Sequence, residues 1–175
     1  MTRETSELSH DIERELSSWI KGAKKVVILG VGNPLRKDDS VGGYIAKKLK
    51  KTLRSKTVDI IECETVPENY LGVIERLKPS HVLVVDAAGA GLEPGSFLLT
   101  ELSEVRGLAI SSHNIPLSVF GEYLRRTTCS KVALLAIQPE SMEFGVGLTR
   151  KLKEAADEAA RILLSVLIRF SLDST

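Results

Sequence analysis

The sequence predicts an α/β fold: a three-layer α/β/α domain with a mixed, mostly parallel sheet of about five strands, plus an extra N-terminal helix. Short apolar runs rich in β-branched residues, typical of strands buried on both faces, alternate with segments whose apolar residues recur at helical spacing. The predicted strands cover residues 26–29, 58–61, 81–85, 96–100 and 132–137. Residues 96–100 follow the preceding strand too closely for a helical crossover, so we expect this strand to run antiparallel to its neighbour.

Helices are predicted over residues 41–49, 68–78 and 117–124, and a long amphipathic helix is predicted over residues 149–170. Thr149 offers a hydroxyl N-cap for the last of these, although no Glu or Gln stands three residues later to complete a capping box.

The N-terminal segment reads as a separate amphipathic helix over residues 4–21. Its apolar stripe is formed by Leu8, Ile12, Leu16, Trp19 and Ile20. We therefore divide the chain into residues 1–22, a helix packed on the domain, and residues 23–175, a single α/β domain. The alternative is that this helix is a docking arm for a partner. His10, on the same segment, is expected to be a solvated surface residue.

Composition excludes several classes of protein. The 175 residues allow one domain with a full core. The 24 basic and 23 acidic residues leave a net charge of +1, so neither nucleic acid nor an anionic membrane is an expected partner. No apolar run approaches the roughly 20 residues of a membrane span, and the N-terminus has no secretory apolar region. Cys63 and Cys129 lie far apart, which favours semi-buried structural thiols and a cytoplasmic location over a disulfide framework.

Residues 30–43 join the first predicted strand to the first predicted helix of the domain. We expect the rest of the chain to hold this loop in position. Glycine and asparagine tolerate the backbone angles that such a tight connection requires. In open α/β sheets the loops at the carboxyl ends of strands are where ligands bind.

Three side chains from separate segments are predicted to meet at this end of the sheet. Asp39 follows the first strand, Asp86 ends the third, and His113 lies in a loop just before a helix. Two carboxylates and an imidazole suit divalent nickel or zinc and leave positions open for other ligands. Each residue also has a structural explanation: Asp38 and Asp39 could cap a helix, Asp86 could bond loop amides, and His113 could stabilise a turn.

Other nucleotide and hydrolase motifs fail on inspection. Leu35 stands where the third glycine of a dinucleotide-binding fingerprint is expected, and no Gly-Lys-Ser/Thr of a P-loop follows. There is no Gly-x-Ser-x-Gly elbow, and neither cysteine lies in a recognisable nucleophile motif.

Several motifs in order resemble those of the hydrogenase maturation endopeptidases, which remove a C-terminal peptide from the large subunit of nickel-iron hydrogenases. The first is Gly-x-Gly-Asn-x-Leu-x-x-Asp-Asp at residues 30–39. The others are Thr-Val-Pro-Glu-Asn at 65–69, Val-Val-Asp-Ala at 84–87, Ser-His-Asn-Ile-Pro-Leu at 112–117 and Ala-Ile-Gln-Pro-Glu at 136–140. The resemblance runs from about residue 25 to about residue 149 and is greatest to the branch that serves formate-hydrogenlyase-type hydrogenases.

The resemblance implies that Asp39, Asp86 and His113 are the metal-contacting and catalytic residues. It implies a substrate that is the nickel-loaded precursor of a hydrogenase large subunit, with nickel supplied by that precursor, no tightly bound cofactor, and zinc or cadmium able to occupy the same ligands. We expect a cytoplasmic monomer with this protein partner, and neither nucleic acid nor membrane insertion. Asp38 is assigned mainly to capping, and Asn33 to holding the loop or a substrate carbonyl.

Two features depart from the family pattern: Ser40 stands where the family often has glycine, and the N-terminal helix is extra. Ser40 is expected to stiffen the loop. Two alternatives stay open. One is a non-catalytic maturation factor that binds the nickel precursor or a metal without cutting, and the other is a nucleotide-binding α/β protein.

Overall fold

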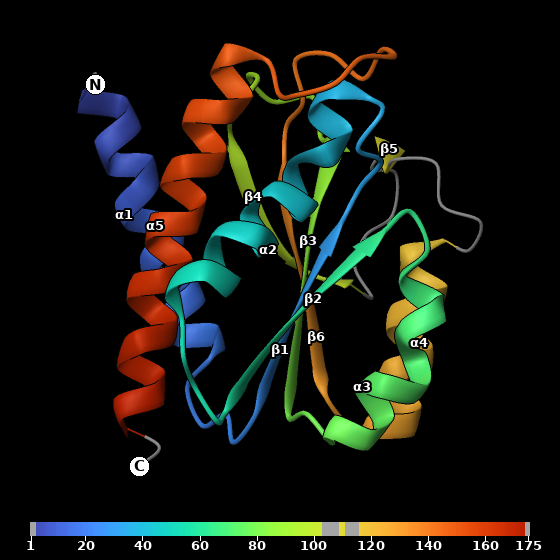
Figure 1. The fold of residues 1–175 in the computed structure, drawn as a ribbon. Coiled ribbons are helices and arrows are strands. Elements are labelled where there is room, and N and C mark those ends of the chain that lie inside the picture. The colour runs from blue at the N-terminus through green and yellow to red at the C-terminus, as the bar shows by residue number, and fades with distance from the viewer. Residues whose placement is uncertain (1–2, 103–108, 111–115, 174–175) are drawn as a thin grey trace.

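The computed structural model describes residues 3–102, 109–110 and 116–173, and it forms a central sheet with helices on both faces (Figure 1). The strands are β1 (Val26–Val31), β2 (Val58–Glu64), β3 (His81–Gly89), β4 (Phe97–Glu101), β5 (Ala109–Ile110) and β6 (Lys131–Ile137). The order of the main sheet is β2-β1-β3-β6-β4, and β5 pairs with the end of β3. Pairs β1–β2, β1–β3 and β3–β6 are parallel, whereas β4 runs antiparallel to β6. The predicted mixed sheet is confirmed.

The α-helices are α1 (Arg3–Trp19), α2 (Val41–Thr52), α3 (Leu71–Leu77), α4 (Leu117–Thr128) and α5 (Arg150–Asp173), and the short 3-10 helices are η1 (Lys37–Ser40) and η2 (Pro67–Tyr70). Figure 1 shows α1, α2 and α5 on one side of the sheet and α3 and α4 on the other. The structure is therefore three-layered, as predicted. Among the described residues, no helix combines the length and the apolar content that crossing a membrane requires.

Successive side chains along a strand point to opposite faces of the sheet, so the continuous apolar runs of the central strands make both faces apolar. On β3, Leu83 and Val85 pack in the core under α2 and α5, whereas Val82 and Val84 pack in the second core under α3 and α4. The same alternation holds along β1 and β6. These strands read as continuous apolar runs because both faces are covered.

The helix α1 lies along α5 (Figure 1). Ile12, Leu16 and Ile20 of the N-terminal segment are buried in the core shared with α2 and α5, and Glu13 pairs with Arg169 at 2.6 Å. His10 is exposed.

Several boundaries and one environment differ from the expectation. The strand predicted to end at Asp86 continues to Gly89, because β3 stays paired with β6 and then with β5 after β1 has stopped. The helix predicted over residues 68–78 begins as the 3-10 turn η2, and α3 covers only Leu71–Leu77. Cys63 is buried, but Cys129 is exposed, at the C-cap of α4, where its backbone is left-handed.

Candidate active site

The loop between β1 and α2 is held in one conformation by its own backbone and side chains. Gly32 has φ +139°, and a Cβ there would lie 1.7 Å from the Asp39 carbonyl oxygen, so only glycine fits. The Asn33 Oδ1 accepts a hydrogen bond from the Leu35 amide at 2.9 Å. The Ser40 hydroxyl donates to the Lys37 carbonyl at 2.6 Å. Asn33 and Ser40 thus stabilise the loop, as the sequence suggested.

Asp39 is placed by this loop in a buried position, with 1% of its surface exposed. Its Oδ2 accepts a hydrogen bond from the Asn33 amide at 3.3 Å. Its Oδ1 is buried and has no hydrogen-bond partner among the described residues. A buried carboxylate oxygen without a partner is costly, so an acceptor position at this point suits a cation or a donor supplied from outside the chain.

Asp86 lies at the same end of the sheet on the neighbouring strand. The residue before it, Val85, pairs with Gly30, so Asp86 stands level with the last residue of β1. It is fully buried, and its Oδ1 accepts a hydrogen bond from the Ala87 amide at 2.8 Å. By the alternation of β3, Asp86 points to the face covered by α3 and α4.

The beginning of α2 packs closely on the ends of β1 and β3. A Cβ on Gly42 would lie 2.1 Å from the Val85 carbonyl oxygen and 2.3 Å from that of Val31. The 3-10 helix η1, which carries Asp39, contacts β3, which carries Asp86. The structure therefore brings these two predicted site residues to neighbouring elements at one end of the sheet.

His113, the third predicted residue, lies outside the described residues. In the sequence it precedes Leu117, the first residue of α4, by four positions. Within the described part of the chain, no group of three His, Cys, Asp or Glu side chains is close enough to hold a metal ion. The assignment of all three residues to one site therefore stays a prediction.

Asp38 plays a different role from the helix cap that was predicted. Its buried carboxylate accepts hydrogen bonds from the Glu140 amide (3.0 Å), the Ser141 amide (2.8 Å), the Thr149 amide (2.7 Å) and the Thr149 hydroxyl (3.0 Å). The capping assignment to α2 is wrong, because the intervening turn η1 directs Asp38 toward the loop after β6, and Ser40, at the N-cap of α2, makes no side-chain cap bond.

The sequence contained one signal for this contact. Thr149 was predicted to cap α5 without the acidic or amide partner of a capping box. Its hydroxyl is within 3.4 Å of the Leu152 amide, as a cap requires, and the accompanying acid is Asp38 from a distant loop. Gln138 holds the neighbouring loop after β3, since its Oε1 accepts from the amides of Ala90 (2.8 Å) and Leu92 (3.2 Å).

The two acids have the donor chemistry that a divalent metal requires. Asp39 Oδ1 supplies an unsatisfied hard oxygen ligand, and Asp86 supplies a second carboxylate at the same end of the sheet. Asp38 is excluded as a ligand because backbone amides and a hydroxyl occupy its oxygens. The residues present therefore fit a metal held mainly by carboxylates, with other ligands to be added.

A thiol nucleophile does not fit the structure. Burial raises the pKa of Cys63 to about 12, so its thiol stays protonated at neutral pH and is a poor nucleophile. Cys129 lies at the end of α4, at the amino-terminal end of β6, away from the two acids.

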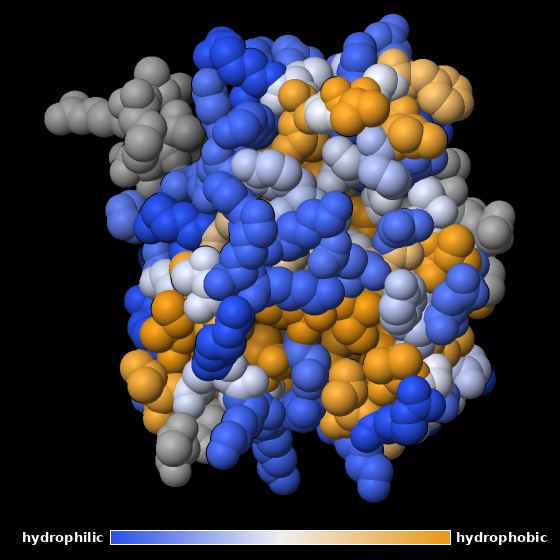
Figure 2. All heavy atoms as spheres, in the orientation of Figure 1, coloured by the Kyte–Doolittle hydropathy of each residue, from blue (hydrophilic) through white to orange (hydrophobic). Residues whose placement is uncertain are grey.

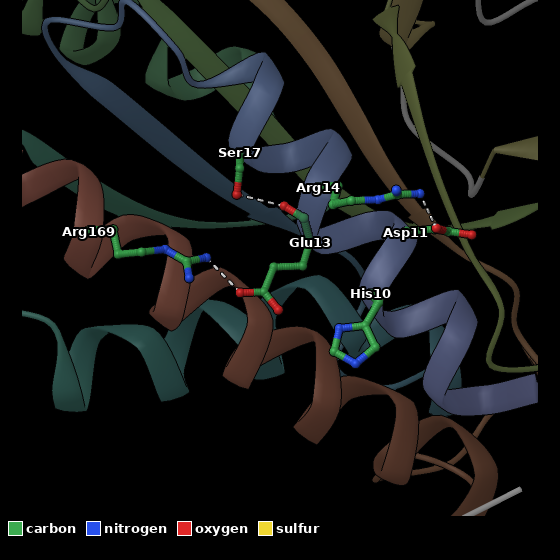
Figure 3. Close-up of a pocket in the computed structure, with 6 residues that line it drawn as sticks. All are labelled: His10, Asp11, Glu13, Arg14, Ser17 and Arg169. Atoms are coloured by element: carbon green, nitrogen blue, oxygen red, sulfur yellow. Dashed lines mark hydrogen bonds and ion pairs between the residues drawn. The ribbon is translucent and has the colours of Figure 1, made fainter. Parts of the chain in front are cut away.

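A wide groove lies elsewhere, between α1 and α5 (Figure 3). It has a volume of about 870 Å³ and is lined by six residues: His10, Asp11, Glu13, Arg14, Ser17 and Arg169. Its charged side chains pair with one another, Glu13 with Arg169 and Asp11 with Arg14. Neither Asp39 nor Asp86 lines this groove, so we do not assign the chemistry to it.

Known proteins match both the sequence and the fold of this chain. Residues 44–166 match the family HycI, described as hydrogenase maturation protease. The hydrogenase 3 maturation protease of Escherichia coli strain K12 is 30% identical over 132 residues, which cover 75% of this chain and 83% of that protein. The crystal structure of a [NiFe] hydrogenase maturation protease HycI from Thermococcus kodakarensis superposes with a TM-score of 0.82 at 33% identity, covering 87% of this chain and 98% of that one. The solution structure of the endopeptidase HycI from Escherichia coli gives a TM-score of 0.72 at 28% identity, with coverages of 81% and 90%.

Proposed function

The chain belongs to the hydrogenase maturation protease family, and from this we propose that it is the endopeptidase that removes a C-terminal peptide from the nickel-loaded precursor of a nickel-iron hydrogenase large subunit. The observation that carries the proposal beyond membership is the buried Oδ1 of Asp39, which has no partner among the described residues. Asp39 belongs to η1, which contacts β3, the strand that carries the second acid, Asp86, at the ligand-binding end of the sheet.

In this proposal Asp39, Asp86 and His113 recognise the nickel that the precursor already carries. Three ligands leave coordination positions that groups of the precursor fill, so the complete coordination sphere exists only in the complex. Recognition of the metal places the scissile peptide bond beside the two carboxylates.

The hydrolysis then needs an activated water and a polarised carbonyl. A metal at this point polarises the carbonyl or lowers the pKa of the attacking water. Asp86 is the candidate general base: its Oδ1 is oriented by the Ala87 amide. Asp38 does not react; it fixes the loop that carries Asp39 against the loop after β6.

We further propose that the protein holds no metal tightly by itself and acts as a monomer in the cytoplasm. Carboxylates and one imidazole without thiolates form an open site, whereas closed thiolate and imidazole sets hold structural metals. Cys63 is buried and Cys129 is exposed, and the two form no disulfide with each other, as a reducing compartment requires.

The test is cleavage of purified precursor, followed by mass spectrometry of the product. Nickel-loaded precursor should be shortened by protein purified with chelator, nickel-free precursor should stay intact, and nickel added to the protease alone should not rescue it. Zinc or cadmium at high concentration should inhibit by competing for the same three side chains.

Two results would contradict the proposal. Binding of the precursor without any shortened product would indicate a non-catalytic maturation factor. A tightly held stoichiometric metal, with activity lost on its removal and restored by zinc, would indicate an ordinary metalloprotease. A thermal shift with a dinucleotide is not expected.

A further inference from the structure

Three bulky apolar side chains are exposed together at the carboxyl end of the sheet. Leu35 is 59% exposed, Phe144 is 83% exposed and Val146 is 87% exposed. We call these three residues the apolar rim. Figure 2 shows hydrophobic side chains gathered at the top of the molecule, over the loops that follow β1 and β6 in Figure 1. Single exposed apolar residues are common, but a cluster on one end of a domain marks a binding surface.

The two loops of the apolar rim are joined through their backbones. The Gly145 amide donates to the Leu35 carbonyl at 2.9 Å, and the Lys37 amide donates to the Gly145 carbonyl at 2.9 Å. These bonds form a parallel bridge between Arg36 and Gly145. The register of this bridge places Leu35 across from Phe144 and Lys37 across from Val146, although about 110 positions separate the two segments in sequence.

The structure also prevents the apolar rim from folding back into the core. The Asp38 carboxylate holds the amides of Glu140 and Ser141, and the Arg36 Nε donates to the Met142 carbonyl at 3.1 Å. A Cβ on Gly145 would lie 3.2 Å from the Lys37 side chain, so the loop rests on Lys37 at this residue. The exposure of Phe144 and Val146 thus belongs to a fixed loop.

One ion pair, between Lys37 and Glu143, flanks the apolar rim. Lys37 Nζ lies 2.8 Å from Glu143 Oε2, and the pKa of Glu143 is lowered by this contact. With these charges compensated, the surface offers apolar contact without a strong preference for an acidic or a basic partner.

We propose that the apolar rim docks a stretch of the precursor chain that bears bulky apolar side chains and lies next to the scissile bond. This inference rests on the proposed function. Leu35 and Asp39 belong to one loop, four positions apart. Asp38, next to Asp39, accepts hydrogen bonds from the loop after β6 that carries Phe144, so both loops of the apolar rim are joined to the candidate active site. A protein substrate whose scissile bond lies beside Asp39 must pass over this end of the sheet. Burial of its apolar side chains against Phe144 and Val146 would fix the position of the chain.

The test compares three variants by cleavage kinetics and by binding of the precursor to the immobilised protein. In the double variant Phe144→Ser/Val146→Ser, the KM and the Kd for nickel-loaded precursor should rise about tenfold or more, whereas kcat should stay within about twofold. The substitutions remove contacts that bind the precursor equally in the ground state and in the transition state. The double variant Phe144→Leu/Val146→Ile should keep both constants within about twofold. Leu172→Ser is the matched control, since Leu172 is 72% exposed on the last turn of α5, at the opposite end of the molecule (Figure 1).

The outcomes separate this inference from the proposed function. Unchanged KM and Kd in the serine double variant, while the unmodified protein cuts and binds, would overturn the docking role only. Binding that weakens in that variant although neither protein cuts would support the docking role and overturn the peptidase assignment. If the unmodified protein is a dimer by light scattering and the serine variant is a monomer with unchanged Kd, the apolar rim is a contact between two copies of this chain and the proposal fails.

Discussion

The two ends of the sheet each contain a buried polar atom without a partner among the described residues, and the two atoms have different surroundings. At the carboxyl end the atom is Oδ1 of Asp39, and at the amino end it is Nε2 of His81. His81 begins β3, is 4% exposed, and packs edge-on against Trp19 with ring centroids 5.0 Å apart. Its Nδ1 lies 3.1 Å from the Ser80 hydroxyl, which also accepts from the amides of Lys24 and Lys25.

The difference shows that an unpartnered atom does not by itself mark a site. Imidazole can remain neutral in an apolar environment. Burial, followed by the charge of Lys131, lowers the pKa of His81, and a weaker contact with the Trp19 backbone opposes this shift. Asp39 stands in η1, at the end of the sheet where α/β proteins bind ligands, and η1 contacts β3, the strand that carries Asp86. The amino end of the sheet is thus filled by packed side chains, whereas the carboxyl end offers an unpartnered carboxylate oxygen to a ligand.

The largest expected effect is on catalysis at the carboxyl end. Asp39→Ala, Asp86→Ala and His113→Ala should each lower the rate of precursor processing by at least about 100-fold. Asp39 and Asp86 are buried, and alanine removes the hydrogen bonds that they accept from the Asn33 and Ala87 amides, at a cost of about 1–3 kcal/mol each. The variants should nevertheless remain folded by circular dichroism. Processing at the normal rate by any of them would remove that residue from the site.

The sequence predicted the sheet well because strand positions depend on local composition. β1, β3 and β6 are continuous apolar runs, and the short connection to β4 was enough to predict its antiparallel direction. The continuation of β3 to Gly89 was missed because it depends on pairing with β5 and β6.

The candidate site could be predicted only where its residues follow strands. Motif and strand order predicted that Asp39 and Asp86 lie at one end of the sheet, and their elements do meet there, whereas their joint role in a site stays a prediction. The partners of Asp38 could not be predicted, because Thr149 lies 111 positions further along the chain. The apolar rim was missed for the same reason: only the bridge between Arg36 and Gly145 brings Leu35 to Phe144.

The next effect concerns α1, whose last residue, Trp19, packs on His81 at the amino end of the sheet. Leu16→Ala should lower the free energy of unfolding by about 3 kcal/mol, because Leu16 is 3% exposed in the core shared with α5. Denaturant titration measures this change. Cleavage and precursor recognition should stay unchanged at temperatures where the variant is folded. A stable Leu16→Ala protein that no longer recognises its precursor would instead make α1 a docking element.

A smaller effect should separate the two adjacent acids. Asp38→Asn should cost about 2 kcal/mol of unfolding free energy, since the amide group can no longer accept all the bonds from Glu140, Ser141 and Thr149. Asp39→Asn should change stability by less than about 1 kcal/mol but weaken metal binding far more than Asp38→Asn does. Denaturant titration and calorimetric titration with nickel measure the two properties. Equal effects of both substitutions on metal binding would mean that the wrong member of the pair was assigned to the metal.

The smallest effect is the pH dependence that His81 imposes on stability at the amino end. Burial lowers the pKa of His81 below the value near 6.5 that it has when the chain is unfolded, so between these two pKa values the unfolded state binds more protons. The free energy of unfolding should therefore fall as the pH drops below about 6.5, and His81 should contribute no slope above that value.

Replacement of His81 by phenylalanine keeps an aromatic ring against Trp19 and removes the titration. Denaturant titration from pH 8 to pH 5 measures the unfolding free energy of the unmodified protein and of His81→Phe. Below about pH 6.5 the unmodified protein should lose stability relative to His81→Phe. His10→Gln, at an exposed histidine, is the matched control and should leave the profile unchanged. A difference that is constant with pH would show that His81 is not held neutral by burial and that the two ends of the sheet are less different than their unpartnered atoms indicate.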